Sequence, residues 1–338
     1  MKKKESDVPN ELEQSDEQIE KKFKLNWNII LIAAILIIAV VAIVKLVIWN
    51  AGTKSDYDPN NIAEGFDIEP LDTIIPLSTS KLEGREDDGI LNILCLGGNP
   101  LTDETGSKSF TSQLAKLADA TVYNGGFPNS TIGAKFSAYN SEYPRDNFTL
   151  PYVAKSISSK DFSAMEQAAA TESDPLYKQS VETLKSIDYD KIDMLVIMYD
   201  ATDYLEKIPS DNPNDPHELS TYTGGLRNAL EDIQEAYPHI RIFVMSHTYA
   251  QSIDENGNYT NGGTTDLGNG TLPHYLVKEV DVSISCGVSV IDNYYGSVNE
   301  DNYNDYMTDY LHLNNDGRKL LAERLVKVIN MGHATAQE

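Results

Sequence analysis

The sequence predicts an α/β domain with about five parallel strands, preceded by one N-terminal transmembrane helix. Three observations lead to this prediction. Short, nearly continuous aliphatic segments recur along residues 89–331, and helical patterns alternate with them. A long apolar run stands near the N-terminus. Two cysteines are too few for a disulfide framework, so a packed core must hold the domain.

The apolar run extends from Ile29 to Val44, and it reaches Ile48 if the Lys45 ammonium extends to the membrane surface. That length spans a bilayer as a helix. Three lysines precede the run and acidic residues follow it, so we expect the N-terminus in the cytoplasm and the main domain outside. A cleaved signal peptide is the alternative, but "VIWNAGTKS" offers only a weak cleavage site.

We therefore divide the chain into five parts. Residues 1–24 are rich in Lys, Glu, Asp and Gln, which predicts a disordered cytoplasmic tail. The transmembrane helix takes residues 25–49. Residues 50–88 mix Pro, Gly and acids with short apolar pieces, which is typical of a linker that lies partly against a domain. The folded domain follows over 89–331, and 332–338 form a short tail.

The net charge of −25 comes from 27 basic and 52 acidic residues. Residues 1–50 hold seven lysines and seven acids, so the excess lies in the outer part of the chain. A negative field repels nucleic acid and anionic lipid surfaces, and it keeps a domain soluble. We expect no nucleic-acid partner.

The aliphatic segments are rich in β-branched residues, which suits parallel strands covered on both faces. The predicted strands are 90–97, 120–125, 193–200, 240–247 and 288–295, and the predicted helices are 109–117, 176–186, 225–237 and 316–331. Alternation of this kind predicts a doubly wound sheet, whose functional residues gather beyond the carboxyl ends of the strands. That edge holds "GGNPLTDE", "NGGFPNST", "YDATDY", "SHTYAQ" and the segment before the last helix.

The strongest candidate for chemistry is "DYLHLNNDG", in which Asp309 and His312 precede the last helix. At this spacing the carboxylate can accept a hydrogen bond from Nδ1 of the imidazole and leave Nε2 facing a cleft. Such a pair is the orienting half of a hydrolytic triad.

Taken in order, these segments resemble the SGNH/GDSL hydrolase family of lipases and esterases, over about residues 88–331. The family's Gly-Asp-Ser block falls on Gly97, Gly98 and Asn99, and its second block places Asn129 on a glycine of the oxyanion hole. "DATD" fills the Gly-x-Asn-Asp block with residues 200–203, and the Asp-x-x-His-Leu block is met in full.

The resemblance implies a flavodoxin-like three-layer fold without a cofactor or metal. It makes His312 and Asp309 the catalytic pair, with Asn99 at the nucleophile position. The oxyanion-hole positions are then Gly98, Asn129 and Thr202. The implied ligands are acyl or acetyl esters on cell-surface carbohydrate, in a protein anchored in a cell membrane beside envelope polysaccharide or acyltransferase machinery.

Asn99 is the serious departure from the family pattern, because a carboxamide is not a nucleophile at neutral pH. Two function classes remain. In the first, the domain is a non-catalytic binder that uses the old cleft. In the second, it is an esterase or O-acyltransferase in which Thr102 or Ser130, the nearest hydroxyls on the same edge, works with His312 and Asp309. Loop hydroxyls more often bond only to backbone.

Four further features leave alternatives open. His247 either contacts a ligand or bonds to backbone, and the thiols of Cys95 and Cys286 are either separately buried or joined. Residues 254–271 resemble a calcium loop but lack its closing Glu, so we expect an irregular excursion without metal. A run of tyrosines forms either a stacking surface for sugar rings or internal packing: Tyr294, Tyr295, Tyr303, Tyr306 and Tyr310.

Overall fold

The computed structural model describes residues 35, 45, 69–82 and 88–335, with side chains to residue 330. The predicted tail 1–24 and transmembrane helix 25–49 lie outside the described residues except for Ile35 and Lys45. Among the residues that are described, none of the helices combines the length and the apolar character needed to cross a bilayer. The chain divides into two compact units, residues 1–67 and residues 68–338, and the second unit contains the predicted α/β domain.

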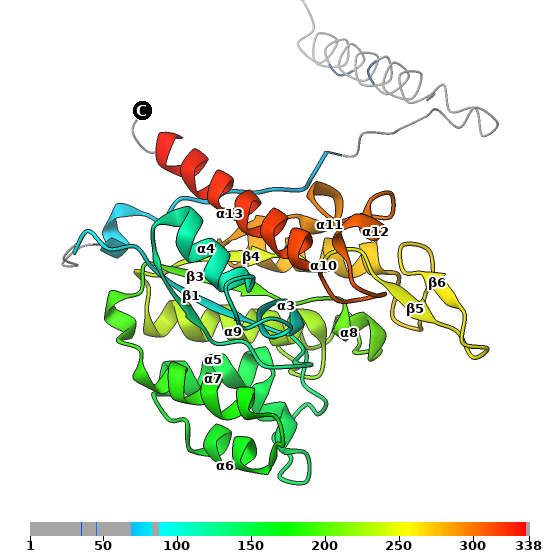
Figure 1. Cartoon of the computed structure of the whole chain (residues 1–338), viewed down its shortest axis with the longest axis horizontal. Helices are drawn as coiled ribbons and strands as arrows, with labels where there is room; N and C mark the ends of the chain where they lie inside the picture. Colours follow the sequence, from blue (N-terminus) through cyan, green and yellow to red (C-terminus); the bar gives the residue numbers. More distant parts are fainter. Residues whose placement is uncertain (1–34, 36–44, 46–68, 83–87, 336–338) are drawn as a thin grey trace, which may run out of the picture. The chain divides into compact units, whose positions relative to one another are not determined.

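The second unit is built on a five-stranded parallel sheet, as predicted (Figure 1). Its strand order is β2-β1-β3-β4-β7, which is the flavodoxin-like order. The strands are β1 Asn92–Gly97, β2 Thr121–Asn124, β3 Met194–Met198, β4 Arg241–Met245 and β7 Ser289–Ile291. The chain leaves β1 toward β2 and then crosses back to β3. The gap between the carboxyl ends of β1 and β3 is therefore the switch point where such sheets bind ligands.

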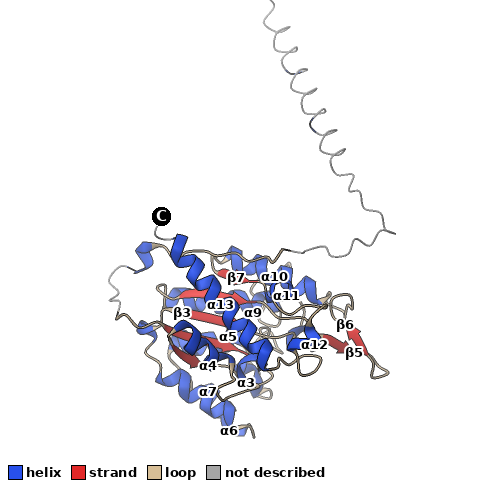
Figure 2. Cartoon of the chain, turned by 45° about the horizontal axis from the view of Figure 1, so that its top comes forward, coloured by secondary structure: helices blue, strands red, loops and turns tan. Residues whose placement is uncertain are grey.

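Helices cover both faces of this sheet (Figure 2). The longer ones are α4 Phe110–Ala118, α5 Leu150–Ser159, α6 Ser163–Thr171, α7 Pro175–Ser186, α9 Tyr222–Ala236, α10 Leu272–Ser285 and α13 Asn315–Thr335. The short ones are α3 Asn99–Thr102, α8 Thr202–Leu205, α11 Asn293–Gly296 and α12 Tyr303–Tyr306, with 3-10 turns η2 Thr79–Leu82, η3 Pro144–Phe148 and η4 Tyr189–Lys191.

Alternating side chains of the strands divide the core into two clusters, because successive side chains of a strand point to opposite faces. On β1, Leu94 and Leu96 pack with the helices α5, α6, α7, α9 and α10. Ile93 and Cys95 point the other way and pack with α4 and α13. Both faces of the central strands are buried, which explains why the strands read as unbroken aliphatic segments.

The two edges of the sheet differ. Outside β7, Thr73 forms an antiparallel bridge in which its N–H and C=O both bond to Val290 at 2.9 Å. Arg324 of α13 holds this segment through both carboxylate oxygens of Asp72, at 2.8 Å each. Outside β2, no described strand pairs with the edge.

The structure corrects several sequence-based boundaries. The last strand ends at Ile291 rather than at residue 295, because Asp292 caps α11 by accepting the Tyr295 N–H. Part of the predicted irregular excursion 254–271 belongs to a hairpin, with β5 Gln251–Ile253 paired to β6 Tyr259–Asn261. Helices α5, α6 and α10 were not predicted; α5 and α10 each begin with a proline in the first turn, and α6 has no capping side chain.

Candidate functional site

The site begins where β1 ends at the switch point and the chain turns into α3. Gly97 fits against β3 only because it lacks a side chain: a Cβ there would lie 1.9 Å from the Met198 carbonyl oxygen. The next turn brings Asn99 to the first position of α3, with only 3% of its surface exposed. The predicted elbow is present, and its tip is buried.

Both ends of the Asn99 carboxamide are hydrogen-bonded to the protein. Its Nδ2 donates to Oδ2 of Asp200 at 2.8 Å, and its Oδ1 accepts the Asn129 backbone N–H at 2.8 Å. Asp200 closely follows β3, so this bond joins the ends of two neighbouring strands. The side chain at the nucleophile position thus holds the two walls of the site together.

All three oxyanion-hole donors expected from the sequence are bonded to acceptors within the chain. The Gly98 N–H donates to the Met198 carbonyl at 3.3 Å, and the Asn129 N–H donates to Asn99. The Thr202 hydroxyl donates to Oδ1 of Asp200 at 2.5 Å, and the Thr202 N–H reaches the same oxygen at 3.0 Å. In this arrangement no expected donor points toward a substrate carbonyl.

Asn129 and Asp203 give the loop after β2 its shape. Asn129 has φ 50°, the left-handed conformation that Asn tolerates well. Asp203 accepts the N–H groups of Ile132 and Gly133 at 2.9 and 2.8 Å. Burial raises the pKa of Asp203 to about 7, against the lowering effect of these hydrogen bonds. Asp203 therefore supports the site and does not face it.

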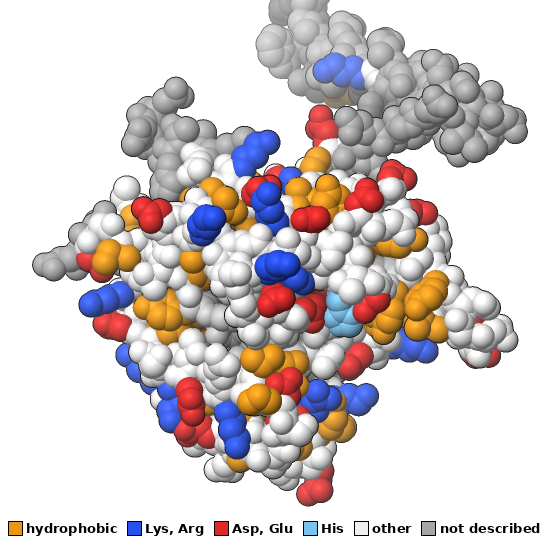
Figure 3. Space-filling model, in the orientation of Figure 1, with side chains coloured by type: hydrophobic (Ala, Val, Ile, Leu, Met, Phe, Trp, Pro, Cys, Tyr) orange, Lys and Arg blue, Asp and Glu red, His pale blue; other side chains and the backbone are white. Residues whose placement is uncertain are grey.

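The histidine side of the site forms as the sequence predicts. Nδ1 of His312 lies 2.8 and 3.0 Å from the two carboxylate oxygens of Asp309, whose Oδ1 also accepts the backbone N–H of His312. Both side chains remain accessible, 32% exposed for His312 and 42% for Asp309. No hydrogen bond from the described chain engages Nε2 of His312. In Figure 3 a histidine lies among acidic side chains on the domain surface.

Two further carboxylates act on His312, from Asp103 just after α3 and from Asp200. Partial burial alone would lower the pKa of His312, but the hydrogen bond to Asp309 and the three negative charges outweigh it and raise the pKa. Asp103 keeps solvent contact, yet the surrounding protein raises its pKa to about 7 against the opposing charge of His312. An imidazole and a carboxyl whose pKa values are both raised therefore share this rim.

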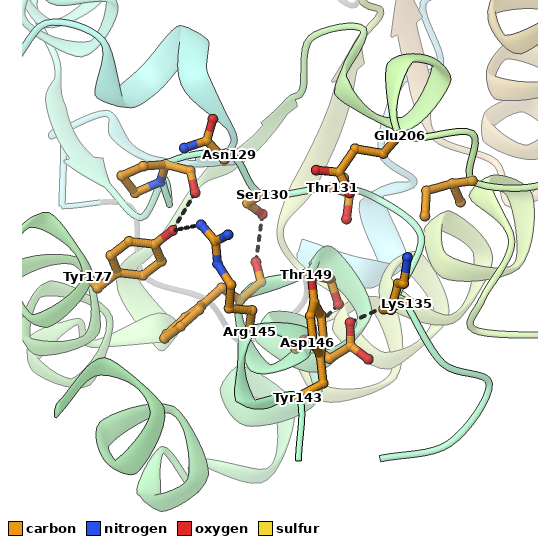
Figure 4. A pocket seen from close by; sticks show the side chains of 13 residues that line it. Asn129, Ser130, Thr131, Lys135, Tyr143, Arg145, Asp146, Thr149, Tyr177 and Glu206 are labelled. Atoms are coloured by element: carbon orange, nitrogen blue, oxygen red, sulfur yellow. Dashed lines mark hydrogen bonds between the residues drawn. The ribbon is translucent and has the colours of Figure 1, made fainter. Parts of the chain in front are cut away.

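The hydroxyls of both alternative nucleophiles face backbone carbonyls. Thr102 contacts the Gly98 carbonyl through its hydroxyl at 3.4 Å and lines a cavity beside β2. Ser130 donates to the Phe148 carbonyl at 2.7 Å and lines a cavity of about 30 Å³ with Asn129. Figure 4 shows the cavity that Ser130 lines, with Arg145 and Tyr177 on one side and Glu206 on the other. Neither hydroxyl is hydrogen-bonded to the imidazole.

The remaining sequence candidates lie in the core or pack against it. His247 is buried with Nδ1 3.8 Å from Oε2 of Glu279, and burial lowers the pKa of His247 to about 4. The whole tyrosine run packs inward: Tyr294 lies in the core, and four partly buried rings pack against it, Tyr295, Tyr303, Tyr306 and Tyr310. Cys95 is buried and Cys286 is half-buried where α10 ends, and the two thiols are free and not joined in a disulfide.

Sequence reasoning missed the roles of Asp103 and Asp200. Asp103 lies four residues after Asn99, so one helical turn brings it to the same rim. Asp200 occupies the family's glycine position, where a carboxylate directly after a buried strand is a signal in itself. The sequence alone does not show that the Asp200 carboxylate bonds to Asn99, or that the Asp103 carboxylate acts on the charge of His312.

The architecture is similar to that of solved proteins. No family model and no curated protein matches the sequence. A solved protein from Lactobacillus plantarum superposes with a TM-score of 0.50 at 17% identity, over 72% of this chain and 97% of that one. A possible lipase from Chitinophaga pinensis gives 0.48 at 13% over 71% and 98%, and a carbohydrate acetylesterase from Sinorhizobium meliloti gives 0.43 at 11% over 71% and 99%.

The strand order and the position of the sequence blocks around the switch point define the class of protein. The α/β domain has an SGNH hydrolase-like fold. At the end of β1, where the sequence resemblance predicts the catalytic serine, this chain carries Asn99.

Proposed function

We propose that this chain is a cell-envelope protein whose SGNH hydrolase-like domain binds its ligand without serine-type catalysis. In this proposal residues 25–49 hold it in a cell membrane as a single-pass helix, with the N-terminus cytoplasmic and the domain outside. The ligand is an acyl- or acetyl-bearing carbohydrate of the cell surface. Envelope polysaccharide or acyltransferase machinery would be the partner that supplies or modifies it.

One observation carries the proposal: the Asn99 carboxamide bonds to both Asp200 and the Asn129 N–H. Serine-type acyl transfer needs a hydroxyl that gives its proton to His312, and it needs free donors for the developing oxyanion. Here the nucleophile position supplies an amide, and that amide occupies one of the expected donors. Loss of a triad nucleophile lowers the rate by roughly 10⁶-fold.

The test compares p-nitrophenyl acetate hydrolysis by the full chain and its variants. The wild type and His312→Ala should hydrolyse the ester equally slowly. The double variant Asn99→Ser/Asp200→Gly supplies a hydroxyl, frees the Asn129 N–H and releases the Thr202 hydroxyl from its carboxylate. We expect it to exceed the wild type by at least about tenfold, a small part of what a restored triad provides.

Asn99→Ala/Asp200→Gly is the matched control, because it frees the same donors without adding a hydroxyl. It should remain as slow as the wild type. Wild-type hydrolysis that disappears in His312→Ala would overturn the proposal. If Asn99→Ser/Asp200→Gly folds but stays inactive, the hydrogen bonds of the Asn99 amide are not what prevents catalysis.

The second candidate is an esterase or acyltransferase with a displaced nucleophile. The intact Asp309–His312 pair, with Nε2 of the imidazole accessible, favours it. The hydroxyls of Thr102 and Ser130 point to backbone carbonyls instead, which disfavours it. Thr102→Val and Ser130→Ala distinguish the two, since only the second candidate predicts that either substitution removes His312-dependent turnover.

A further inference from the structure

The cavity that Thr102 lines has a volume of about 270 Å³. It lies beside the open edge strand β2, between α4 and α7. Thirteen residues line it, and ten of them carry a hydroxyl or a carboxamide. None of the thirteen is charged, although the chain has 79 charged residues out of 338 by its 27 basic and 52 acidic side chains. A lining that is polar and uncharged is unusual on so acidic a surface.

The hydroxyls of Ser109, Thr111 and Ser112 in this lining bond to one another, and two other kinds of polar group remain. Ser180, Asn124 and Thr183 each donate a hydrogen bond to a backbone carbonyl, at 2.6, 2.8 and 2.9 Å. These bonds fix the side chains and leave the lone pairs of the two hydroxyls as acceptors. The side chains of Tyr123 and Gln179 make no hydrogen bond within the described chain, so they retain both donors and acceptors.

This combination matches a ligand whose groups each donate and accept one hydrogen bond and which brings no charge. Burying a charged ligand against uncharged walls would leave its charge unpaired, at a large desolvation cost. An apolar ligand would leave the fixed polar groups unsatisfied. The half-buried ring of Tyr123 adds one aromatic surface to the lining.

We propose that this cavity is a binding site for a neutral sugar ring. Sugar hydroxyls pair with the hydroxyl and amide groups of the walls, and the β2 edge forms the floor beside Tyr123. Neither His312 nor Asp309 lines the cavity, so the site does not depend on whether Asn99 closes the old catalytic centre. Thr102 contributes to it as part of the wall, which gives this hydroxyl a place in binding instead of catalysis.

The experiment uses the full chain in a detergent without a sugar headgroup. Saturation-transfer NMR and calorimetry measure binding of methyl β-glucoside, methyl β-galactoside and N-acetylglucosamine, with glucuronate and glucosamine as charged counterparts. Thr183→Trp fills the cavity from α7. Thr171→Trp at the end of α6 is the matched control: both threonines bond to a carbonyl of their own helix, and Thr171 does not line the cavity.

We expect saturable binding of at least one neutral sugar, weakened at least tenfold in Thr183→Trp and unchanged in Thr171→Trp. Gln179→Leu should also weaken it, and because Gln179 and Thr183 line this cavity, their effect separates it from the cleft of His312 tested in the hydrolysis assay. Failure of every neutral sugar to saturate, equal binding of the charged sugars, or unchanged binding by Thr183→Trp would overturn the proposal.

Discussion

The two halves of the candidate site obey different physical constraints. The Asn99 half is buried, and its polar groups are bonded to one another: Asn99 to Asp200, Asn129 to Asn99, and Thr202 to Asp200. The Asp309–His312 half is exposed, and water can serve its remaining nitrogen. A buried polar group must find a partner inside the protein, whereas an exposed one need not. Replacing a serine hydroxyl with a larger amide therefore affects every donor around it, while the histidine pair keeps its geometry.

The largest effect that sharpens this comparison is expected at Asp200. Asp200→Ala removes the acceptor of the Asn99 amide and of both Thr202 donors, and leaves these groups buried without a partner. We expect the free energy of unfolding to fall by about 2–4 kcal/mol. Chemical denaturation followed by circular dichroism measures it. Asp309→Ala, on the exposed half, is the control, and an equal loss there would refute the contrast.

A smaller effect concerns pH, and it contrasts a buried carboxyl with the exposed pair. Burial of Glu279 raises its pKa from 4.5 to about 8, so the unfolded chain loses this proton well before the folded one does. Stability from this group is complete at acid pH and is lost as the pH rises toward 8. We expect the contribution of Glu279 to the free energy of unfolding, measured as the difference between the wild type and Glu279→Gln, to fall by about 2 kcal/mol between about pH 5 and pH 8.

Glu279→Gln should flatten that dependence, and His312→Ala should leave it in place. Denaturation series at several pH values measure both. An unchanged pH dependence in Glu279→Gln would contradict the prediction.

The smallest effect is expected for the exposed pair. Asp309→Asn removes a hydrogen-bonded negative charge from His312, and the pKa of His312 should fall toward its usual value. Proton NMR titration of the imidazole measures this shift. The free energy of unfolding should change by less than about 1 kcal/mol, because exposed ion pairs contribute little. An unchanged imidazole pKa would show that Asp103 and Asp200 dominate its field.

Much of the fold could be predicted from the sequence because the signals are local. Unbroken aliphatic segments mark strands buried on both faces, and all five predicted strands are found in the sheet. The last strand is shorter than predicted, since "VSVIDNYY" continues its apolar pattern beyond the residue at which Asp292 caps a helix. The helices α5 and α10 were missed because their composition includes proline and β-branched residues, and tertiary packing overrides such weak preferences.

By itself, the sequence determined the contacts that short spacing decides. His312 is the third residue after Asp309, so one turn of chain brings the carboxylate to Nδ1, and the identity of Asn99 excludes a serine nucleophile at that position. The tertiary structure alone decided what Asn99 does. Its partner Asp200 is 101 residues away, and they meet only because β1 and β3 are neighbours in the sheet. Hydrogen bonds between distant side chains depend on strand order and register, which residue spacing does not encode.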